Sequence, residues 1–133
     1  MSREIKFRIW RAPDEYDKEF WMESWDSLMN YSMSDIFQLD NPDDVLEQFT
    51  GLKDKNGKDI YEGDILAWHS NIYRKHDWVG LVLYRGAGFA VQESDKSYSS
   101  PEWLECACCK DANIVEIVGT IHENPELLEA QHE

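Results

Sequence analysis

Positive charge is scarce in this sequence. Its 133 residues contain 13 Lys and Arg against 27 Asp and Glu, for a formal net charge of −14. Because affinity for nucleic acid rests on Lys and Arg that neutralise phosphates, this deficit argues against direct binding of DNA or RNA. The acids are concentrated in two segments: residues 12–50 hold eleven acids and one Lys, and residues 102–133 have a net charge of −7. Such a surface suits solubility or a basic partner protein.

Long apolar runs and a cysteine framework are also missing. No stretch approaches the ~18 apolar residues of a membrane span, and the start, MSREIKFRIWR, lacks the apolar region and cleavage site of a signal peptide. The three cysteines are an odd number, and Cys108 and Cys109 are adjacent, which is not typical of a secreted disulfide scaffold. We therefore expect a cytoplasmic protein with free thiols and no membrane association.

Five residues could be considered as zinc ligands: His69, His76, Cys106, Cys108 and Cys109. Zinc sites usually combine C-x2-C with H-x3-5-H. Here the cysteines follow C-x-C-C and the histidines are seven residues apart, so the spacing favours small buried cysteines beside surface histidines. The sequence does not tell whether these side chains approach one another, and we predict no metal site.

Two acidic clusters offer an alternative function. Asp14, Glu15 and Asp17, or Asp40, Asp43 and Asp44, could bind a hard cation or hydrolyse a glycoside, with tryptophans as sugar platforms. That alternative is a metal-dependent hydrolase or a carbohydrate-active domain. A solvated acidic face with core aromatics is the favoured interpretation, and no Gly-x-Ser-x-Gly elbow is present. We predict no catalytic residue, no cofactor and no enzymatic activity.

The N-terminal region, residues 1–50, is expected to form an acidic hairpin and a helix. Ile5, Phe7 and Ile9 alternate with charged residues, which indicates a half-buried strand. Residues 12–18 read as a turn and 19–25 as the second strand, while 26–40 are ambiguous. In NPDDVLEQF (41–49), Asn41 as N-cap and Pro42 at the first helical position predict a helix. A near copy, with Asn124, Pro125 and Glu126, predicts a short C-terminal helix in 124–133.

The segment between the two predicted helices reads as a β core, residues 51–123. Strands are predicted at 65–69, at 78–85 with Val79, Leu81 and Leu83 on one face, at 89–93 after the turn RGAG, and at 114–122. Short strands joined by glycine-containing turns predict a mainly β fold. We expect one domain over 1–133, a small SH3-like barrel or sandwich with an N-terminal β-hairpin and one or two short helices.

The stretch QFTGLKDKNGKDIYEGDILAW (48–68) raises the question of a ligand-binding loop. From Asp54, an EF-hand requires glycine at the sixth position, but Gly57 is at the fourth. A Walker loop requires Ser or Thr after Gly57-Lys58, where Asp59 stands. What remains is Asn56-Gly57, which tolerates positive φ at both central positions of a hairpin turn. We predict a structural turn.

Three blocks, REIKFRIW, QFTGLKDKNGKDIYEGDIL and VGTIHENPELLE, occur in this order. In this combination the chain resembles the YopX family of phage and prophage proteins. The resemblance implies a mostly β, single-domain fold, an origin in a phage or integrated prophage, and action inside a bacterial host. It brings no established activity and no catalytic residues to transfer.

Three tryptophans could form an interface. Trp10 lies opposite the Ile5/Phe7/Ile9 face, and Trp21 and Trp25 are expected on one face of the next strand. If those faces meet solvent, they form an aromatic patch of the kind that marks a protein interface. Our hypothesis is a non-enzymatic phage accessory protein that binds a host or phage protein, or itself as a homo-oligomer, through acidic residues around aromatic anchors.

Overall fold

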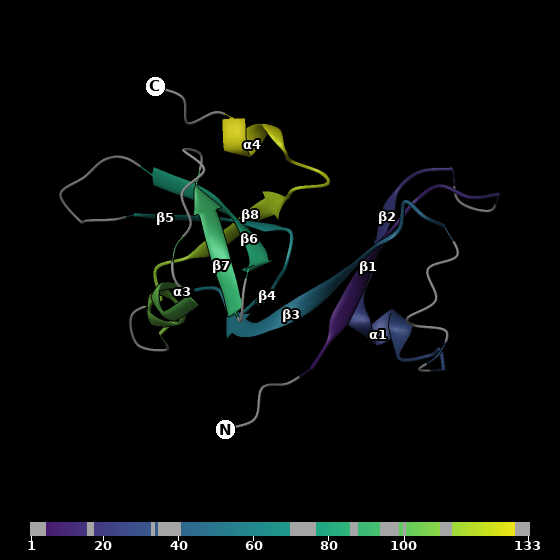
Figure 1. Cartoon of the computed structure of the whole chain (residues 1–133), viewed down its shortest axis with the longest axis horizontal. Coiled ribbons are helices and arrows are strands. Elements are labelled where there is room, and N and C mark those ends of the chain that lie inside the picture. Colours follow the sequence, from purple (N-terminus) through teal and green to yellow (C-terminus); the bar gives the residue numbers. More distant parts are fainter. Residues whose placement is uncertain are drawn as a thin grey trace. The chain divides into compact units, whose positions relative to one another are not determined.

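A computed structural model describes residues 5–15, 18–32, 34, 41–69, 77–85, 88–93, 99, 101–109 and 113–129. The fold is mainly β, as predicted from the sequence, with two four-stranded sheets (Figure 1). Their strand orders are β2-β1-β3-β4 and β7-β6-β5-β8. The chain divides into two compact units, which we call unit 1 (Met1–Phe49) and unit 2 (Thr50–Glu133). Within the described part, no helix is both long and apolar enough to cross a membrane.

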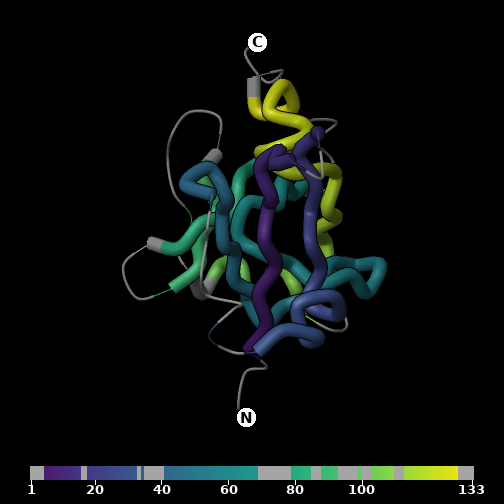
Figure 2. Tube along the Cα trace, turned by 90° about the vertical axis from the view of Figure 1, so that its right-hand side faces the viewer, coloured from purple at the N-terminus to yellow at the C-terminus, as the bar shows by residue number. Residues whose placement is uncertain are grey.

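Unit 1 is built on strand β1, which pairs antiparallel with a strand on each side. Its elements are β1 (Phe7–Arg11), β2 (Trp21–Glu23), α1 (Trp25–Leu28) and the first part of β3 (Val45–Lys53). Figure 2 shows the trace of β1 running between β2 and β3. The expected N-terminal hairpin is therefore present. One face of β1 and β3 meets α1, where Ile9 and Leu28 are fully buried beside Trp25 and Leu46.

Unit 2 contains the β7-β6-β5-β8 sheet, strand β4 and two helices. Its elements are the end of β3, then β4 (Asp59–Tyr61), β5 (Asp64–His69), β6 (Asp77–Arg85), β7 (Gly88–Glu93), α3 (Pro101–Ala107), β8 (Glu116–Thr120) and α4 (Glu126–Glu129). Strands β5 to β8 were all predicted to within a few residues. Helix α4 follows the Asn124-Pro125 start as predicted. Helices α1 and α3 were not foreseen, so the described residues hold three helices instead of one or two.

A continuous hydrophobic core fills unit 2. It joins nine buried residues from five strands or their flanks and from α3: Ile60, Leu66, Trp68, Val82, Phe89, Val91, Leu104, Ala107 and Val115. Gly80 shares this face of β6, and a Cβ at that position would collide with Val91. The predicted apolar face of β6, Val79, Leu81 and Leu83, is only half-buried. The core therefore takes the alternate residues, Gly80 and Val82.

The predicted helix at 41–49 is wrong. Asn41 does accept the amide of Asp43, at 3.0 Å, but the carbonyl of Asn41 accepts the amide of Asp44, so the segment turns. From Val45 the chain is the strand β3, whose residues Val45–Gln48 pair with β1. Asn, Pro and Asp serve β-turns and helix N-termini equally well. The pairing with β1, about forty residues away in the chain, decides between them.

Candidate functional site

The buried carboxylates of unit 1 are the strongest candidate for chemistry. Glu23 is 1% exposed and Glu47 is 4% exposed, and each meets an arginine of β1. Glu47 lies directly opposite Arg8 in the β1–β3 register, and their Oε1 and Nε atoms are 2.8 Å apart. Glu23 lies diagonally across from Arg11, again with 2.8 Å between Oε1 and Nε. Both carboxylates are therefore held by a specific cation.

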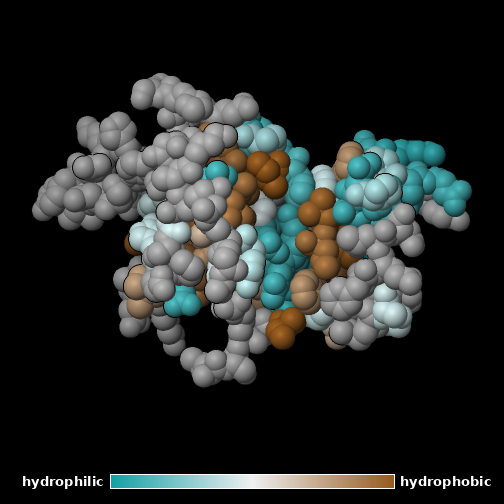
Figure 3. Space-filling model, in the orientation of Figure 1, coloured by the Kyte–Doolittle hydropathy of each residue, from teal (hydrophilic) through white to brown (hydrophobic). Residues whose placement is uncertain are grey.

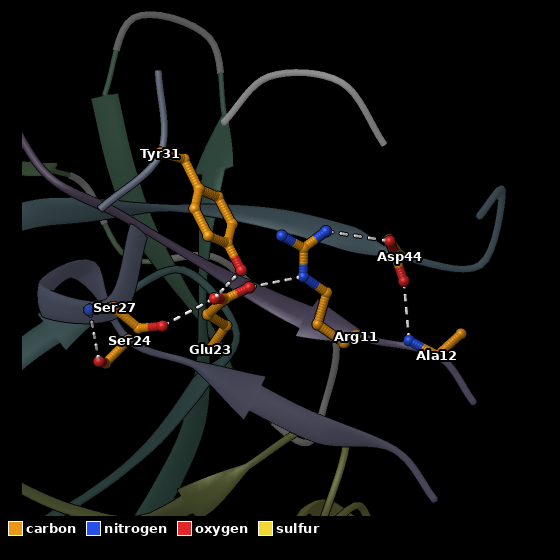
Figure 4. Close-up of polar contacts among 7 residues, drawn as sticks. All are labelled: Arg11, Ala12, Glu23, Ser24, Ser27, Tyr31 and Asp44. Atoms are coloured by element: carbon orange, nitrogen blue, oxygen red, sulfur yellow. Dashed lines mark hydrogen bonds and ion pairs between the residues drawn. The ribbon is translucent and has the colours of Figure 1, made fainter. Parts of the chain in front are cut away.

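A larger network surrounds Arg11, as Figure 4 shows. Oε2 of Glu23 accepts hydrogen bonds from the hydroxyls of Ser27 and Tyr31, both at 2.7 Å. Nη1 of Arg11 reaches Oδ2 of Asp44 at 3.2 Å, and the other oxygen of Asp44 accepts the amide of Ala12 at 2.7 Å. Every oxygen of the two carboxylates has a partner, which is the condition for burying such charges without a large penalty.

The local sequence places these groups. Ser24 follows β2 directly and caps α1, because its side chain accepts the amide of Ser27 at 3.3 Å. The helix therefore begins immediately after the strand. One turn of helix brings Ser27 back to Glu23, four residues earlier, and the turn after the helix brings Tyr31 to the same carboxylate.

The electrostatics fix one charge state for each group. Burial acts to raise the pKa of Glu23, but hydrogen bonds from Tyr31, Ser27 and Arg11 outweigh it, so the pKa is below its ordinary value. Burial acts to lower the pKa of Arg11, and the two carboxylates raise it overall. The hydrogen bond to Glu23 raises the pKa of Tyr31. The arginine, the carboxylate and the two hydroxyls thus stabilise one another, which is typical of a structural network.

The described members of the two acidic clusters form no cation site. Asp14 and Glu15 are exposed, and Asp17 and Asp40 lie outside the described residues. Asp43 is exposed, whereas Asp44 is committed to Arg11 and Ala12. Among the residues the structure describes, no group of three or more His, Cys, Asp or Glu side chains could hold a metal ion.

The cysteines are free thiols in different surroundings. Cys106 and Cys109 are exposed, and Cys108 packs against the core of unit 2. Burial, with a contribution from the charge of Asp54, raises the pKa of Cys108 to about 11. A thiol with that pKa is a poor nucleophile and metal ligand at neutral pH. His76 lies outside the described residues, and of His69 only the backbone, at the end of β5, is described.

The stretch 48–68 is a structural turn, as predicted. The amide of Gly57 donates to the carbonyl of Asp54, and the amide of Asp54 donates to the carbonyl of Lys58, so three residues form the loop of the β3–β4 hairpin. Gly57 has a φ of 84°. The predicted two-residue turn centred on Asn56-Gly57 is therefore wrong in type: glycine occupies the last loop position, as in hairpins with a bulge.

Two buried carboxylates of this stretch, Asp54 and Asp64, bind backbone amides. Buried Asp54 accepts the amides of Asn56 and Lys58 at 2.9 Å with Oδ1, and the amide of Ile117 at 3.0 Å with Oδ2. It thereby fixes the hairpin loop to β8. Buried Asp64 accepts the amide of Tyr61 at 2.8 Å and closes the next turn. The burial of Asp54 and Asp64 is thus explained by their hydrogen bonds to the backbone.

Of the three tryptophans singled out, Trp21 is exposed, whereas Trp10 and Trp25 are half-buried. Trp10 stacks on Phe20, with ring centroids 5.7 Å apart and planes within 9°. Trp21 is 39% exposed. Trp25 does not share a strand face with Trp21 as predicted, because β2 ends at Glu23 and Trp25 begins α1, where its ring contacts Phe7.

The family model described as "YopX protein" matches residues 6–129. The chain belongs to the YopX family. It is also similar to a solved structure, the crystal structure of protein EF1440 from Enterococcus faecalis, with 27% sequence identity and a TM-score of 0.53 over 96% of this chain and 99% of that chain. The comparison with curated proteins gave no match.

The blocks that carry the YopX resemblance hold the fold together. Asp54 and Asp64 close turns in the middle block. In the last block, Oδ1 of Asn124 accepts the amide of Thr120 at 3.3 Å, and a Cβ on Gly119 would collide with Asn124. These polar residues thus form hydrogen bonds within the fold.

Proposed function

We propose that this YopX protein is a non-enzymatic accessory protein of phage or prophage origin, which acts in the bacterial cytoplasm by binding another protein. The supporting observation is the contrast between its polar and apolar groups. The buried titratable groups of unit 1 are paired with one another, so they offer no vacant position for a substrate. The same unit carries several large hydrophobic side chains in solvent: Ile5, Phe20, Trp21, Met29, Tyr31 and Val45.

Exposed hydrophobic side chains gathered in one small unit are typical of a binding surface, because single monomers usually keep such patches small. Aromatic side chains in particular supply much of the affinity of protein interfaces. Unit 2 exposes Tyr84, Ile114 and Val118 but has a full core of its own. The binding surface is therefore assigned to unit 1.

The test compares the wild-type chain with two matched variants. Phe20→Ser alters a side chain that is 50% exposed in unit 1, and Tyr84→Ser alters one that is 52% exposed in unit 2. Each protein is used as bait in a nuclease-treated bacterial lysate, and its mass in solution is measured. Capture of a partner, or self-association, that Phe20→Ser abolishes and Tyr84→Ser retains is the expected result. A monomer that captures nothing specific, or equal capture by all three proteins, would contradict the proposal.

A further inference from the structure

One face of the unit 1 sheet is apolar at the end of the β1–β2 hairpin. Met22 and Val45 lie directly opposite Trp10 on the two neighbouring strands, so the three side chains share one face. Phe20 stacks on Trp10 from the segment that leads into β2. Phe20 is 50% exposed and Val45 is 40% exposed. We call these four residues the hairpin-end patch.

Acidic residues surround this patch. Asp14, Glu15 and Glu19 belong to the connection between β1 and β2 and are exposed, and so is Asp43 in the turn before β3. The side chain of Asn41 donates to the carbonyl of Pro13 at 3.2 Å, which holds that turn beside the connection. Figure 3 shows hydrophilic residues gathered over the hairpin end, at the upper right.

Among the described residues, the neighbouring cations offset only part of the negative charge of this acidic rim. Arg8 and Arg11, from the same hairpin, are turned to the buried carboxylates of Glu47, Glu23 and Asp44. Lys18 is exposed in the connection, and its ammonium lies 3.5 Å from the carbonyl of Glu15. The hairpin end therefore combines exposed aromatic and aliphatic side chains with an excess of negative charge.

We infer that the hairpin-end patch binds an arginine- and lysine-rich segment of a partner protein, an inference that rests on the proposed function. Acidic side chains around an apolar centre attract cations and speed the encounter. The guanidinium of arginine also stacks on aromatic rings, and its aliphatic stem covers apolar surface. A second copy of the chain fits less well, because a two-fold interface would place the same acidic rim against itself.

The experiment uses a labelled arginine-rich peptide and a second peptide with neutral citrulline in place of each arginine. Binding to the full chain is followed by fluorescence anisotropy at several salt concentrations. The arginine peptide is expected to bind, and its affinity is expected to fall as the salt concentration rises, because salt screens exposed charges. The citrulline peptide is expected to bind far more weakly. Equal binding of the two peptides would overturn the inference.

Two matched charge variants show whether binding is local. The first, Glu15→Gln with Glu19→Gln and Asp43→Asn, alters the acidic rim. The second alters three exposed acids of unit 2, Glu105→Gln, Glu123→Gln and Glu126→Gln, and so removes the same charge. The rim variant is expected to bind the arginine peptide with about tenfold lower affinity. Equal weakening by both would mean non-specific attraction to an acidic protein and would overturn the inference.

Phe20→Ser gives an independent measurement. The substitution is expected to lower the affinity for the arginine peptide and to leave the salt dependence of that affinity unchanged, because it removes an aromatic contact and no charge. Unaltered affinity would contradict a role for the patch. Far-UV circular dichroism and thermal melts confirm that each variant is folded. If the lysate partner depends on Phe20 but the arginine peptide does not bind, the inference fails and the proposed function stands.

Discussion

The two units of this YopX protein are stabilised in different ways. Unit 2 has a core of nine buried hydrophobic residues, with Asp54 and Asp64 fastening its turns. In the described part of unit 1 the hydrophobic cluster buries Ile9 and Leu28, and Ala12 and Phe49 are also buried. The unit further holds three arginine–carboxylate contacts. A small sheet with so little apolar core depends on the complete pairing of its charges. Buried carboxylates therefore have two roles in this protein. In unit 2 they accept hydrogen bonds from backbone amides, and in unit 1 they pair with arginines where the hydrophobic core is small.

The largest expected effect tests the charge network of unit 1. Arg11→Met keeps the apolar stem but leaves Glu23 and Asp44 buried without their cation. We expect a loss of about 4 kcal/mol of stability, since removing one partner of a buried pair exposes the full cost of the other charge. Denaturant unfolding gives the size, and hydrogen exchange read separately for peptides of each unit gives the location.

Lys18→Met is the matched control, because it removes an exposed cation of the same unit and should change stability by less than about 0.5 kcal/mol. Loss of protection confined to unit 1 in Arg11→Met would support separate stabilisation of the units. Equal loss of protection in both would show that they unfold together.

The core of unit 2 is tested by Leu66→Ala. Leu66 is fully buried on β5. Truncation leaves a cavity and is expected to cost about 3 kcal/mol, measured from the denaturant midpoint. Val118→Ala, at a position 39% exposed, should cost far less. A small effect of Leu66→Ala would mean that the core collapses around the cavity, and the contrast drawn between the units would weaken.

A third change addresses the buried carboxylate of the β3–β4 hairpin. Asp54→Ala removes the acceptor of three backbone amides. We expect a loss of about 2 kcal/mol, because buried donors without partners retain their desolvation cost. Lys55→Ala, in the same loop but exposed, should be nearly neutral. Thermal melts of the two variants measure the difference, and equal melting temperatures would argue against the structural role of Asp54.

The smallest expected effect is a pH dependence that belongs to unit 1. The pKa of Glu23 is lowered in the folded protein. Its contribution to stability is therefore complete above the pKa of an unfolded glutamate, about 4.3, and is lost as pH falls through the folded-state pKa. The difference in unfolding free energy between wild type and Glu23→Gln should shrink over that range. The difference in unfolding free energy between wild type and Leu66→Ala should stay constant over the same pH range, because that substitution removes no titrating group.

Alternation and turn chemistry predicted most of the strands. Ile5, Phe7 and Ile9 predicted β1, and Asn56-Gly57 predicted the turn between β3 and β4, since these signals are local. The same local chemistry failed at Asn41–Asp44, where one set of residues could start a helix or make a turn. The segment forms a turn followed by a strand because β3 pairs with β1, which is distant in the sequence.

The network around Arg11 was not predicted. Its members, Arg11, Glu23 and Asp44, are 12 and 33 residues apart along the chain, and charged residues in an acidic sequence read as surface. Only the strand register brings them together. Arg11 continues the alternation of Phe7 and Ile9, so the sequence could have indicated that it faces the buried side of β1. It could not have indicated which carboxylate pairs with it.

Strand β3 belongs to both units: Val45–Phe49 lies in unit 1 and the remainder, to Lys53, in unit 2. When genes exchange segments by recombination, a crossover between separate modules leaves each module intact, whereas here the junction falls inside a strand. A hybrid that replaced unit 1 would have to supply the first part of β3 in the same alternation, because a slip of one residue turns every side chain to the opposite face. Replacement of unit 1 alone is therefore constrained by the alternation of β3.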